Sequence, residues 1–337
     1  MDVLGAPLAG ILDQPRRGSF LVTNVAGDGY SSVQVLEGIE LTGKTYLITG
    51  TTSGIGLETA KALVLKGAHV VMFNRNIRTS EVVKKSITSE MPSAKIDLIT
   101  SDLSSMQSVE AAADEFLGKH WPLHGLILNA GLLLPRDSET IDGFETTFGV
   151  NHLAHFMLIK KLLPVLRQSR PSRILKREQT TIEKLEQLCA QNRGNSYSAQ
   201  YKSYAMSKMC NLLTCLKIDR EESKENGIST YAVHPGTVHG TGIFARFGFI
   251  SYVANYAMKL FTKTAEQGAA TSVYCAAHPE VTSVSGKFWE NCWDDDSSMD
   301  KSIACDEMLQ DQLWDHSESL IEKWEKNRKP VSTISSI

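Results

Sequence analysis

The chain has 337 residues, of which 42% are apolar and 22% are charged, and its net charge is −3 at pH 7. This is the composition of a globular protein, and without a basic stripe it gives no sign of nucleic acid as a partner. No stretch reaches the roughly 18 apolar residues of a membrane span, and the N-terminus lacks the basic region of a signal peptide. We therefore expect no transmembrane segment and a cytoplasmic location. The six cysteines are scattered without a CxxC pair, as is typical of reduced thiols.

From residue 44 onward, compact apolar runs alternate with helical patterns. Such alternation predicts an α/β fold of the Rossmann type, with a doubly wound parallel sheet and helices on both faces. The expected strands are 44–50, 68–73, 95–100 and 124–131, and the expected helices are 55–67, 79–90, 105–119 and 143–168. An irregular arm (1–40) precedes this domain, which we place at 41–295. A helical extension (296–337) follows, with one amphipathic helix at 305–326.

A fifth strand should lie in the run SRILKREQTT, which starts at Ser172, but its apolar residues give way early to charge. A central parallel strand is buried on both faces and should not carry Lys, Arg and Glu in succession. We therefore predict that this strand is truncated to about three residues, or that it is lost and a helix starts early. A helical pattern over 180–191, with Thr180 or Thr181 as its N-cap, favours the second form.

The first strand ends in TGTTSGIG, a glycine-rich turn that precedes a helix. Gly50 permits a tight turn, while Gly54 and Gly56 let the backbone approach a ligand and let the helix pack on the strand. The free N–H groups at the start of the helix suit a pyrophosphate. With Ser53 and Ile55 in the same turn, these residues predict a dinucleotide-binding site.

The second strand ends in NRN, with Arg75 at the place where dinucleotide folds read the adenosine ribose. An acidic residue there favours NAD, whereas an arginine can receive the 2′-phosphate of NADP. The sequence therefore favours NADP(H) over NAD. The alternative is that Arg75 is a solvated loop residue.

Two further strand ends carry candidate cofactor contacts. Asp102 and Leu103 follow the third strand, where the carboxylate could accept from the adenine amino group or cap the next helix. Asn129, in LNAG with Ala130 and Gly131, stands at the carboxyl end of the fourth strand, where open α/β sheets bind ligands.

The run SYAMSK places Tyr204 and Lys208 four residues apart, on one face of a helix. An ammonium beside a phenol favours the phenolate and lowers the pKa of the phenol from about 10, which suits it to acid or base work near neutral pH. The spacing is common by chance, and a solvated helix face is the alternative. Tyr201, close by, has no lysine at this spacing.

A glycine-rich TGxxxGIG, a strand-ending NAG, an asparagine in a long helix and YxxxK follow one another along the chain. Over roughly 40–295 the chain therefore resembles the short-chain dehydrogenase/reductase family. The resemblance implies that Tyr204 donates or accepts a proton and that Lys208 binds the nicotinamide ribose and tunes the tyrosine. It also implies that Asn151 anchors a water of a proton relay.

The same resemblance assigns the segments near the nicotinamide. HPGTV would lie beside it through Pro235, Gly236 and Val238, and Thr241 is a candidate for the carboxamide. The aromatic-rich segment 246–261 would cover a lipophilic carbonyl or alcohol, such as a retinoid or steroid. Two helices packed on the core, or a patch that touches a membrane, are the alternatives.

Two further expectations concern metals and partners. His152 and His155, three residues apart beside Asn151, could mimic a metal pair. Because no acidic or cysteine residue completes the pattern, we predict packing and helix-surface roles and no metal. Family members often pair through their long helices, so the resemblance also implies a possible homo-oligomer.

In the family, the fifth strand delivers a serine that holds the substrate oxygen beside the tyrosine. This chain has no serine between Ser172 and Ser196. The nearest hydroxyls, none of them at a matching place, belong to Thr180, Thr181, Ser196, Ser198 and Ser203. The leading hypothesis is an NADP(H)-dependent oxidoreductase that moves a hydride between the nicotinamide and a small-molecule carbonyl or alcohol. The alternatives are a catalytically weak or silent NADP(H)-binding interaction protein, and a defective or alternatively spliced product.

Overall fold

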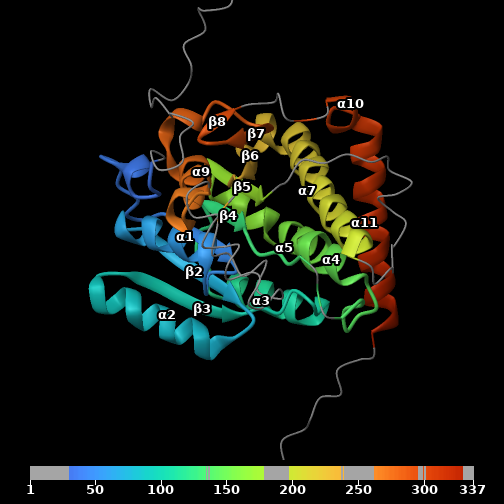
Figure 1. The fold of residues 1–337 in the computed structure, drawn as a ribbon, viewed down its shortest axis with the longest axis horizontal. Helices are drawn as coiled ribbons and strands as arrows, with labels where there is room; N and C mark the ends of the chain where they lie inside the picture. Colours follow the sequence, from blue (N-terminus) through green and yellow to red (C-terminus); the bar gives the residue numbers. More distant parts are fainter. Residues whose placement is uncertain are drawn as a thin grey trace, which may run out of the picture.

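An eight-stranded sheet in the order β3-β2-β1-β4-β5-β6-β7-β8 forms the centre of the molecule (Figure 1). The computed structural model describes residues 30–133, 135, 137–177, 197–236, 238, 262–294, 299 and 301–328. Strands β1 to β7 run parallel, and β8 pairs antiparallel with β7. The strands are β1 (Thr45–Thr49), β2 (His69–Asn74), β3 (Lys95–Thr100), β4 (Gly125–Leu128), β5 (Ser172–Arg177), β6 (Ile228–His234), β7 (Lys287–Glu290) and β8 (Trp293–Asp294).

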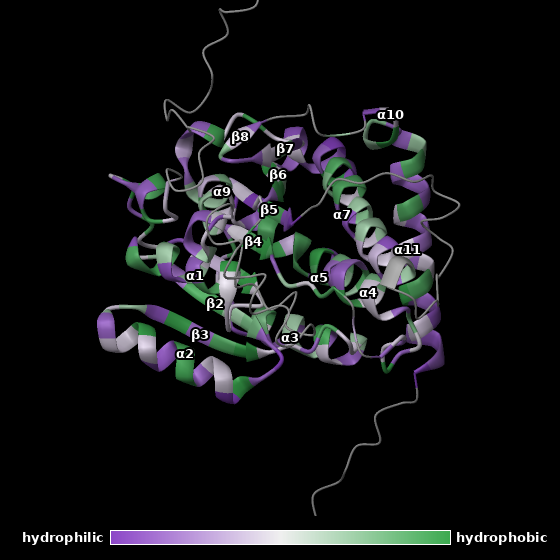
Figure 2. Ribbon diagram, viewed as in Figure 1, coloured by the Kyte–Doolittle hydropathy of each residue, from purple (hydrophilic) through white to green (hydrophobic). Residues whose placement is uncertain are grey.

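Helices cover both faces of the sheet because successive side chains of a strand point to opposite faces. Leu47 and Ile174 belong to the core on the side of α3 and α5, whereas Ile48 and Leu175 belong to the core on the side of α1 and α9. Figure 2 shows green, hydrophobic strands at the centre and helices that carry both green and purple. The helices are η2 (Gln34–Leu36), α1 (Gly54–Leu65), α2 (Ile77–Glu90), α3 (Met106–Gly118), α4 (Thr146–Phe148), η3 (Gly149–Leu153), α5 (Ala154–Gln168), α7 (Tyr197–Asn226), α9 (Ala265–Ala277), η5 (Pro279–Val281), α10 (Lys301–Ala304) and α11 (Glu307–Asn327).

The predicted fold class is confirmed, and the expected strands and helices are present with ends that shift by a few residues. The long helix expected at 143–168 is instead divided into α4, a π-helical turn (η3) and α5. Of the predicted arm, the described residues from 30 onward include the short helix η2. The division into arm, domain and extension stays a prediction. No helix within the described ranges is long and apolar enough to cross a membrane.

The predicted truncation of the fifth strand is wrong. Strand β5 has six residues and pairs with β4 on one side up to Lys176 and with β6 on the other side up to Arg177. Lys176 is fully buried within it. Two hydrogen-bonded neighbours and the packing of Ile174 and Leu175 hold the strand in place, and the apolar stem of a lysine can pack in a core like an aliphatic side chain. The helix predicted at 180–191 lies outside the described residues.

Candidate active site

The glycine-rich turn between β1 and α1 is tightly packed. Gly50 has a φ of +73°, a left-handed conformation that favours glycine. A Cβ on Gly56 would lie 2.1 Å from the carbonyl oxygen of Gly50 and 2.4 Å from Nδ2 of Asn129. Position 56 therefore has no room for a side chain, and α1 begins directly against the end of the sheet.

Asn129 holds this turn from the neighbouring strand β4. Its Nδ2 donates to the carbonyl oxygens of Thr49 and Gly50, each at 3.0 Å. Because Nδ2 faces two carbonyls, the orientation of the amide is settled, and Oδ1 is the buried atom that lacks a hydrogen-bond partner among the described residues. At the carboxyl end of a strand, this acceptor is a candidate for contact with a ligand.

A cavity of about 720 Å³ opens at the carboxyl ends of β1 to β4. Six of the predicted cofactor residues line it: Gly50, Arg75, Asp102, Leu103, Ala130 and Gly131. Arg75 is exposed, and it forms no hydrogen bond or ion pair with any residue in the described ranges. Ser53 is the N-cap residue of α1, yet its hydroxyl makes no capping bond. The cavity thus offers an exposed guanidinium and, at Gly50 and Thr52, the turn that leads into α1, which fit the phosphates of a dinucleotide.

Asp102 does not cap the next helix, so that alternative is wrong. The N-cap residue of α3 is Ser105. The Asp102 carboxylate accepts from the backbone N–H and the hydroxyl of Ser104, at 2.9 and 2.7 Å. Its orientation is therefore set by its own turn, at the wall of the cavity. Contact with adenine stays a prediction.

The phenol of Tyr204 and the ammonium of Lys208 lie side by side on α7, as their spacing predicts. Lys208 Nζ is 5.5 Å from the centroid of the Tyr204 ring, and both residues are buried. Nζ also donates to the carbonyl oxygen of Arg177 at 3.2 Å. A Cβ on Gly131 would lie 3.2 Å from Nζ, so the ammonium of Lys208 meets the rim of the cavity at this glycine. Tyr201 is 45% exposed, and therefore it is the surface residue that its sequence context suggests.

Asn151 joins three elements from its place in the π-helical turn η3. Its Oδ1 accepts from the backbone N–H of Leu132, and its Nδ2 donates to the carbonyl oxygen of Leu132 and to Oγ of Ser207. Ser207 in turn donates to the carbonyl oxygen of Tyr204 at 2.7 Å. These protein contacts occupy both N–H groups of the amide. The side chain is thus a brace between β4 and α7, while the predicted relay water stays a prediction.

Sequence reasoning missed Ser207, although its position offered a signal. It stands three residues after Tyr204, which is close to one helical turn, so the two share a face of α7. Its hydroxyl is committed to Asn151 and to the backbone of Tyr204, so it does not replace the missing serine. Ser203, the other hydroxyl beside Tyr204 in the described ranges, is buried. Thr180, Thr181 and Ser196 lie outside the described residues, as does the side chain of Ser198.

The packing role predicted for the histidine pair is confirmed by their contacts. His155 Nδ1 lies 3.2 Å from the carbonyl oxygen of Asn151, and Nε2 lies 3.1 Å from Oγ1 of Thr49. A carbonyl only accepts, so Nδ1 carries the proton and Nε2 accepts from the threonine hydroxyl. Burial, together with the positive charge of Lys176, holds the pKa of both His152 and His155 well below the usual range. Both rings are therefore neutral near neutral pH.

The predicted segment after β6 is only partly described. Val238 packs with Ile55 at the start of α1 and with Ala269 of α9. Gly236 has a φ of +74°, and its N–H donates to Nδ1 of His234 at 3.1 Å. Ile55 therefore acts here as a packing residue that brings the two loops together. Pro235 is buried beside them, whereas Thr241 and segment 246–261 lie outside the described residues.

The comparisons with known proteins agree with this arrangement of fold and site. The family model described as short chain dehydrogenase matches residues 44–248. The chain belongs to this family of nicotinamide-dependent oxidoreductases. It is 37% identical over 303 residues to the WW domain-containing oxidoreductase of Homo sapiens, which covers 87% of this chain and 72% of that protein.

Two further likenesses agree with the family assignment. Retinol dehydrogenase 11 of Mus musculus is 35% identical over 274 residues, which are 81% of this chain and 85% of that protein. Among solved structures, an uncharacterized protein from Mycobacterium paratuberculosis superposes with a TM-score of 0.63 at 24% identity, covering 87% of this chain and 98% of that one. At this identity the match supports the fold alone.

The neutral histidines predict how stability depends on pH. In the unfolded chain both have a pKa near 6.5, and folding lowers it. Above about pH 6.5 both histidines are neutral in the folded and in the unfolded chain, so they do not reduce the free energy of unfolding. Below about pH 6.5 the unfolded chain binds protons that the folded chain does not bind, and this favours unfolding. We expect the free energy of unfolding to fall by about 1.4 kcal/mol per histidine for each pH unit below 6.5.

Urea unfolding between pH 7 and pH 5 tests this dependence. His155→Gln keeps hydrogen-bonding capacity and should remove about half of the slope that the two histidines cause. The exposed His120 serves as the control, since His120→Gln should leave the slope unchanged. An equal slope in wild-type protein and in His155→Gln would contradict the assignment of a neutral buried ring.

Proposed function

We propose that this chain is an NADP(H)-dependent oxidoreductase that moves a hydride between the nicotinamide and a carbonyl or alcohol carbon. The observation that carries the proposal is that Lys208 Nζ and Asn151 Oδ1 both lie beside Gly131, on the rim of the cavity lined by Arg75, while Lys208 Nζ also lies over the ring of Tyr204. Family membership supports a nicotinamide cofactor.

In this proposal each residue has a distinct task. The nicotinamide, when bound, supplies or accepts the hydride. The phenol of Tyr204 donates a proton to the carbonyl oxygen in reduction, or takes one from the alcohol in oxidation. The Lys208 ammonium beside the ring stabilises the phenolate that remains. Asn151 keeps α7 and the end of β4 at a constant distance through Ser207 and Leu132.

We further propose a lipophilic substrate, such as a retinoid or a steroid. The support is the printed name of one relative, Retinol dehydrogenase 11, at 35% identity, and the aromatic-rich segment 246–261 of this sequence. For the cofactor, the support for NADP(H) over NAD is the exposed guanidinium of Arg75 directly after β2, which has no ion-pair partner among the described residues, and the lack of a carboxylate in NRN.

The choice of cofactor predicts the effect of Arg75→Ala. Loss of charge-assisted hydrogen bonds to a 2′-phosphate should raise the Kd for NADPH about 10–100-fold and leave that for NADH within about twofold. Fluorescence titration with each cofactor measures both constants. Arg78→Ala, at an exposed position on α2 outside the lining of the cavity, is the control. If Arg75→Ala weakened the binding of NADPH and of NADH equally, the assignment of Arg75 to the 2′-phosphate would be wrong.

The proton transfer predicts the effect of Tyr204→Phe. Turnover of lipophilic aldehydes and ketones should fall by about 10²–10⁴, since the phenol supplies the proton. NADPH affinity and melting temperature should change little, because the ring is kept. Tyr201→Phe, at the surface of the same helix, should turn over like the wild type. Equal, near-zero turnover in wild-type and Tyr204→Phe protein would contradict the proposal that this chain is an enzyme.

One observation favours a second function, that of a catalytically weak or silent NADP(H)-binding interaction protein. Strand β5 ends in Lys176 and Arg177, and no serine follows before Ser196. Loss of one donor to a substrate oxygen costs roughly 10²–10³ in rate. Binding of NADPH without measurable turnover would select this second function, and absence of both would indicate a defective product.

A further inference from the structure

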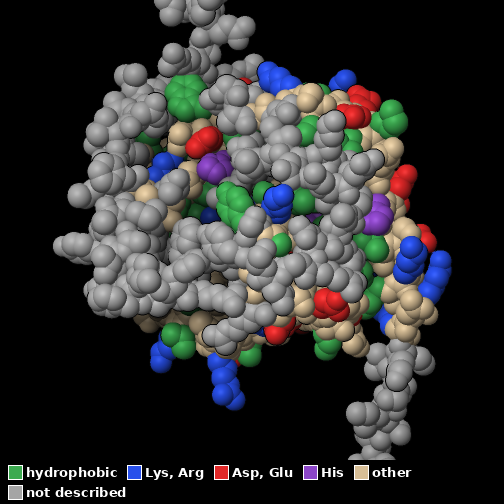
Figure 3. All heavy atoms as spheres, turned by 45° about the vertical axis from the view of Figure 1, so that its right-hand side comes forward, with side chains coloured by type: hydrophobic (Ala, Val, Ile, Leu, Met, Phe, Trp, Pro, Cys, Tyr) green, Lys and Arg blue, Asp and Glu red, His purple; other side chains and the backbone are tan. Residues whose placement is uncertain are grey.

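Helix α11 lies outside α5 and α7 and packs against α7, the helix that carries Tyr204 and Lys208 (Figure 1). It is distant in the sequence from the residues that line the cavity. Its buried residues Leu309, Leu313 and Ile321 pack into the cores beneath it. Charged side chains of both signs crowd this side of the molecule in Figure 3. The helix is therefore firmly attached and not a free extension.

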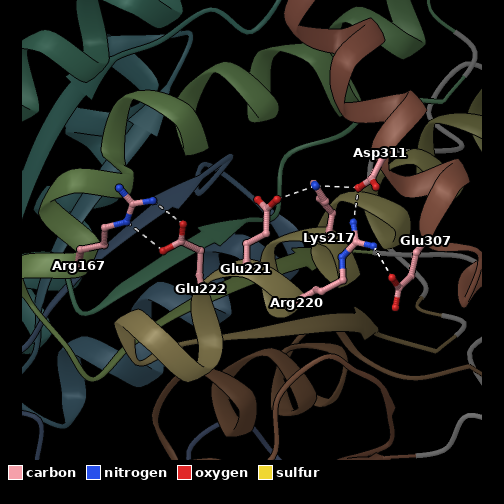
Figure 4. A network of polar contacts seen from close by, with 7 residues as sticks. All are labelled: Arg167, Lys217, Arg220, Glu221, Glu222, Glu307 and Asp311. Atoms are coloured by element: carbon pink, nitrogen blue, oxygen red, sulfur yellow. Dashed lines mark hydrogen bonds and ion pairs between the residues drawn. The ribbon is translucent and has the colours of Figure 1, made fainter.

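Ion pairs fasten α11 to α7 over part of its length (Figure 4). Asp311 lies 2.7 Å from Lys217 Nζ and also pairs with Arg220, which pairs with Glu307 at 2.8 Å. Toward the other end, Trp324 Nε1 donates to Asp142 at 2.8 Å. These contacts lie at some distance from the middle of the helix, where α11 meets the π-helical turn.

At that middle point, Ser317 contacts the residue next to Asn151. Ser317 Oγ donates to the carbonyl oxygen of Leu313 at 2.8 Å and lies 2.9 Å from His152 Nε2. A serine hydroxyl has one hydrogen, so in this contact it accepts, and His152 Nε2–H donates. Both residues are completely buried. The bond therefore fixes the tautomer of His152 and the direction of its ring.

An aromatic column extends the same contact. The rings of Phe148, His152 and Phe156 follow one another with centroid separations of 5.0 and 6.0 Å. Trp314 of α11 meets Phe156 edge-on at 4.7 Å. The column runs along the π-helical turn and the start of α5, so α11 holds the turn by packing as well as by the hydrogen bond.

We propose that His152 is a positioning residue, and that Ser317 on α11 holds it so that Asn151 keeps its contacts with Leu132 and Ser207. Because Asn151 Oδ1 and Lys208 Nζ both lie beside Gly131, a shift of the turn moves the groups around the ammonium and changes its distance from the Tyr204 ring. Helix α11 is thus a part of the active-site framework. The inference rests on the proposed function, which gives Tyr204 the proton transfer.

Ser317→Ala tests the inference, because it removes the acceptor and leaves the rest of α11 in place. We expect kcat to fall about 10–100-fold, as a small misplacement of a reacting group can cause, while the Kd for NADPH stays within about twofold. The pH profile of kcat should move upward, because the phenol lies less close to the ammonium. A purely structural role of α11 would lower the melting temperature and leave this profile unchanged.

Three further variants separate the positioning role of His152 from a purely structural role of α11. His152→Gln keeps an N–H donor toward Ser317 and should retain a wild-type pH profile, whereas His152→Leu should behave like Ser317→Ala. Asp311→Asn weakens the ion pairs with Lys217 and Arg220 without contact to His152. This variant should lower the melting temperature and leave the pH profile of kcat unchanged. A shifted profile in Asp311→Asn, or an unchanged one in Ser317→Ala, would overturn the proposal.

A readout without turnover separates this inference from the proposed function. Ultraviolet difference titration of the phenol, with Tyr204→Phe as the reference, reports Tyr204 even in a silent protein. Burial raises the pKa of Tyr46 and of Tyr231 to about 12, so these two phenols lose their protons at a higher pH than an ordinary tyrosine. If the wild type has no turnover, the proposed enzyme fails. An identical Tyr204 titration in wild type and Ser317→Ala would refute the positioning role by itself.

Discussion

The amide of Asn151 is the contact on which the geometry of the candidate site depends. Its hydrogen bonds to Leu132 and Ser207 join the loop after β4 to α7. The loop carries Gly131 at the rim of the cavity, and α7 carries Tyr204 and Lys208. Both N–H groups of the amide and its carbonyl oxygen make hydrogen bonds, which allows little change in the distance between these elements.

The π-helical turn explains how Asn151 reaches both partners. A regular helix over 143–168 would continue α4 directly into α5, but η3 inserts a wider turn between them. Such turns occur mostly as single insertions in helices and often at functional sites. Behind the turn, His152 and the aromatic column meet α11, so the framework of the site extends to residues more than 150 positions away in the sequence.

Strand β5 shows how tertiary pairing overrides a local pattern. Charged residues at its end argue against a central strand, yet Lys176 pairs with both β4 and β6, and Arg177 continues the pairing with β6. One consequence is electrostatic, because the buried ammonium contributes to keeping His152 and His155 neutral. Another is chemical, because the strand delivers no serine to the neighbourhood of Tyr204.

The sequence by itself determined the alternation of strands and helices, the glycine turn and the Tyr204–Lys208 pair, because these depend on local periodicity and on residues close in the chain. Only the tertiary structure decided the length of β5, the capping of α3 by Ser105 in place of Asp102, and the contacts of Ser207 and Ser317. These features arise where segments distant in the chain pack together. A spacing pattern cannot report such contacts, since their energy depends on which partner the fold places opposite each side chain.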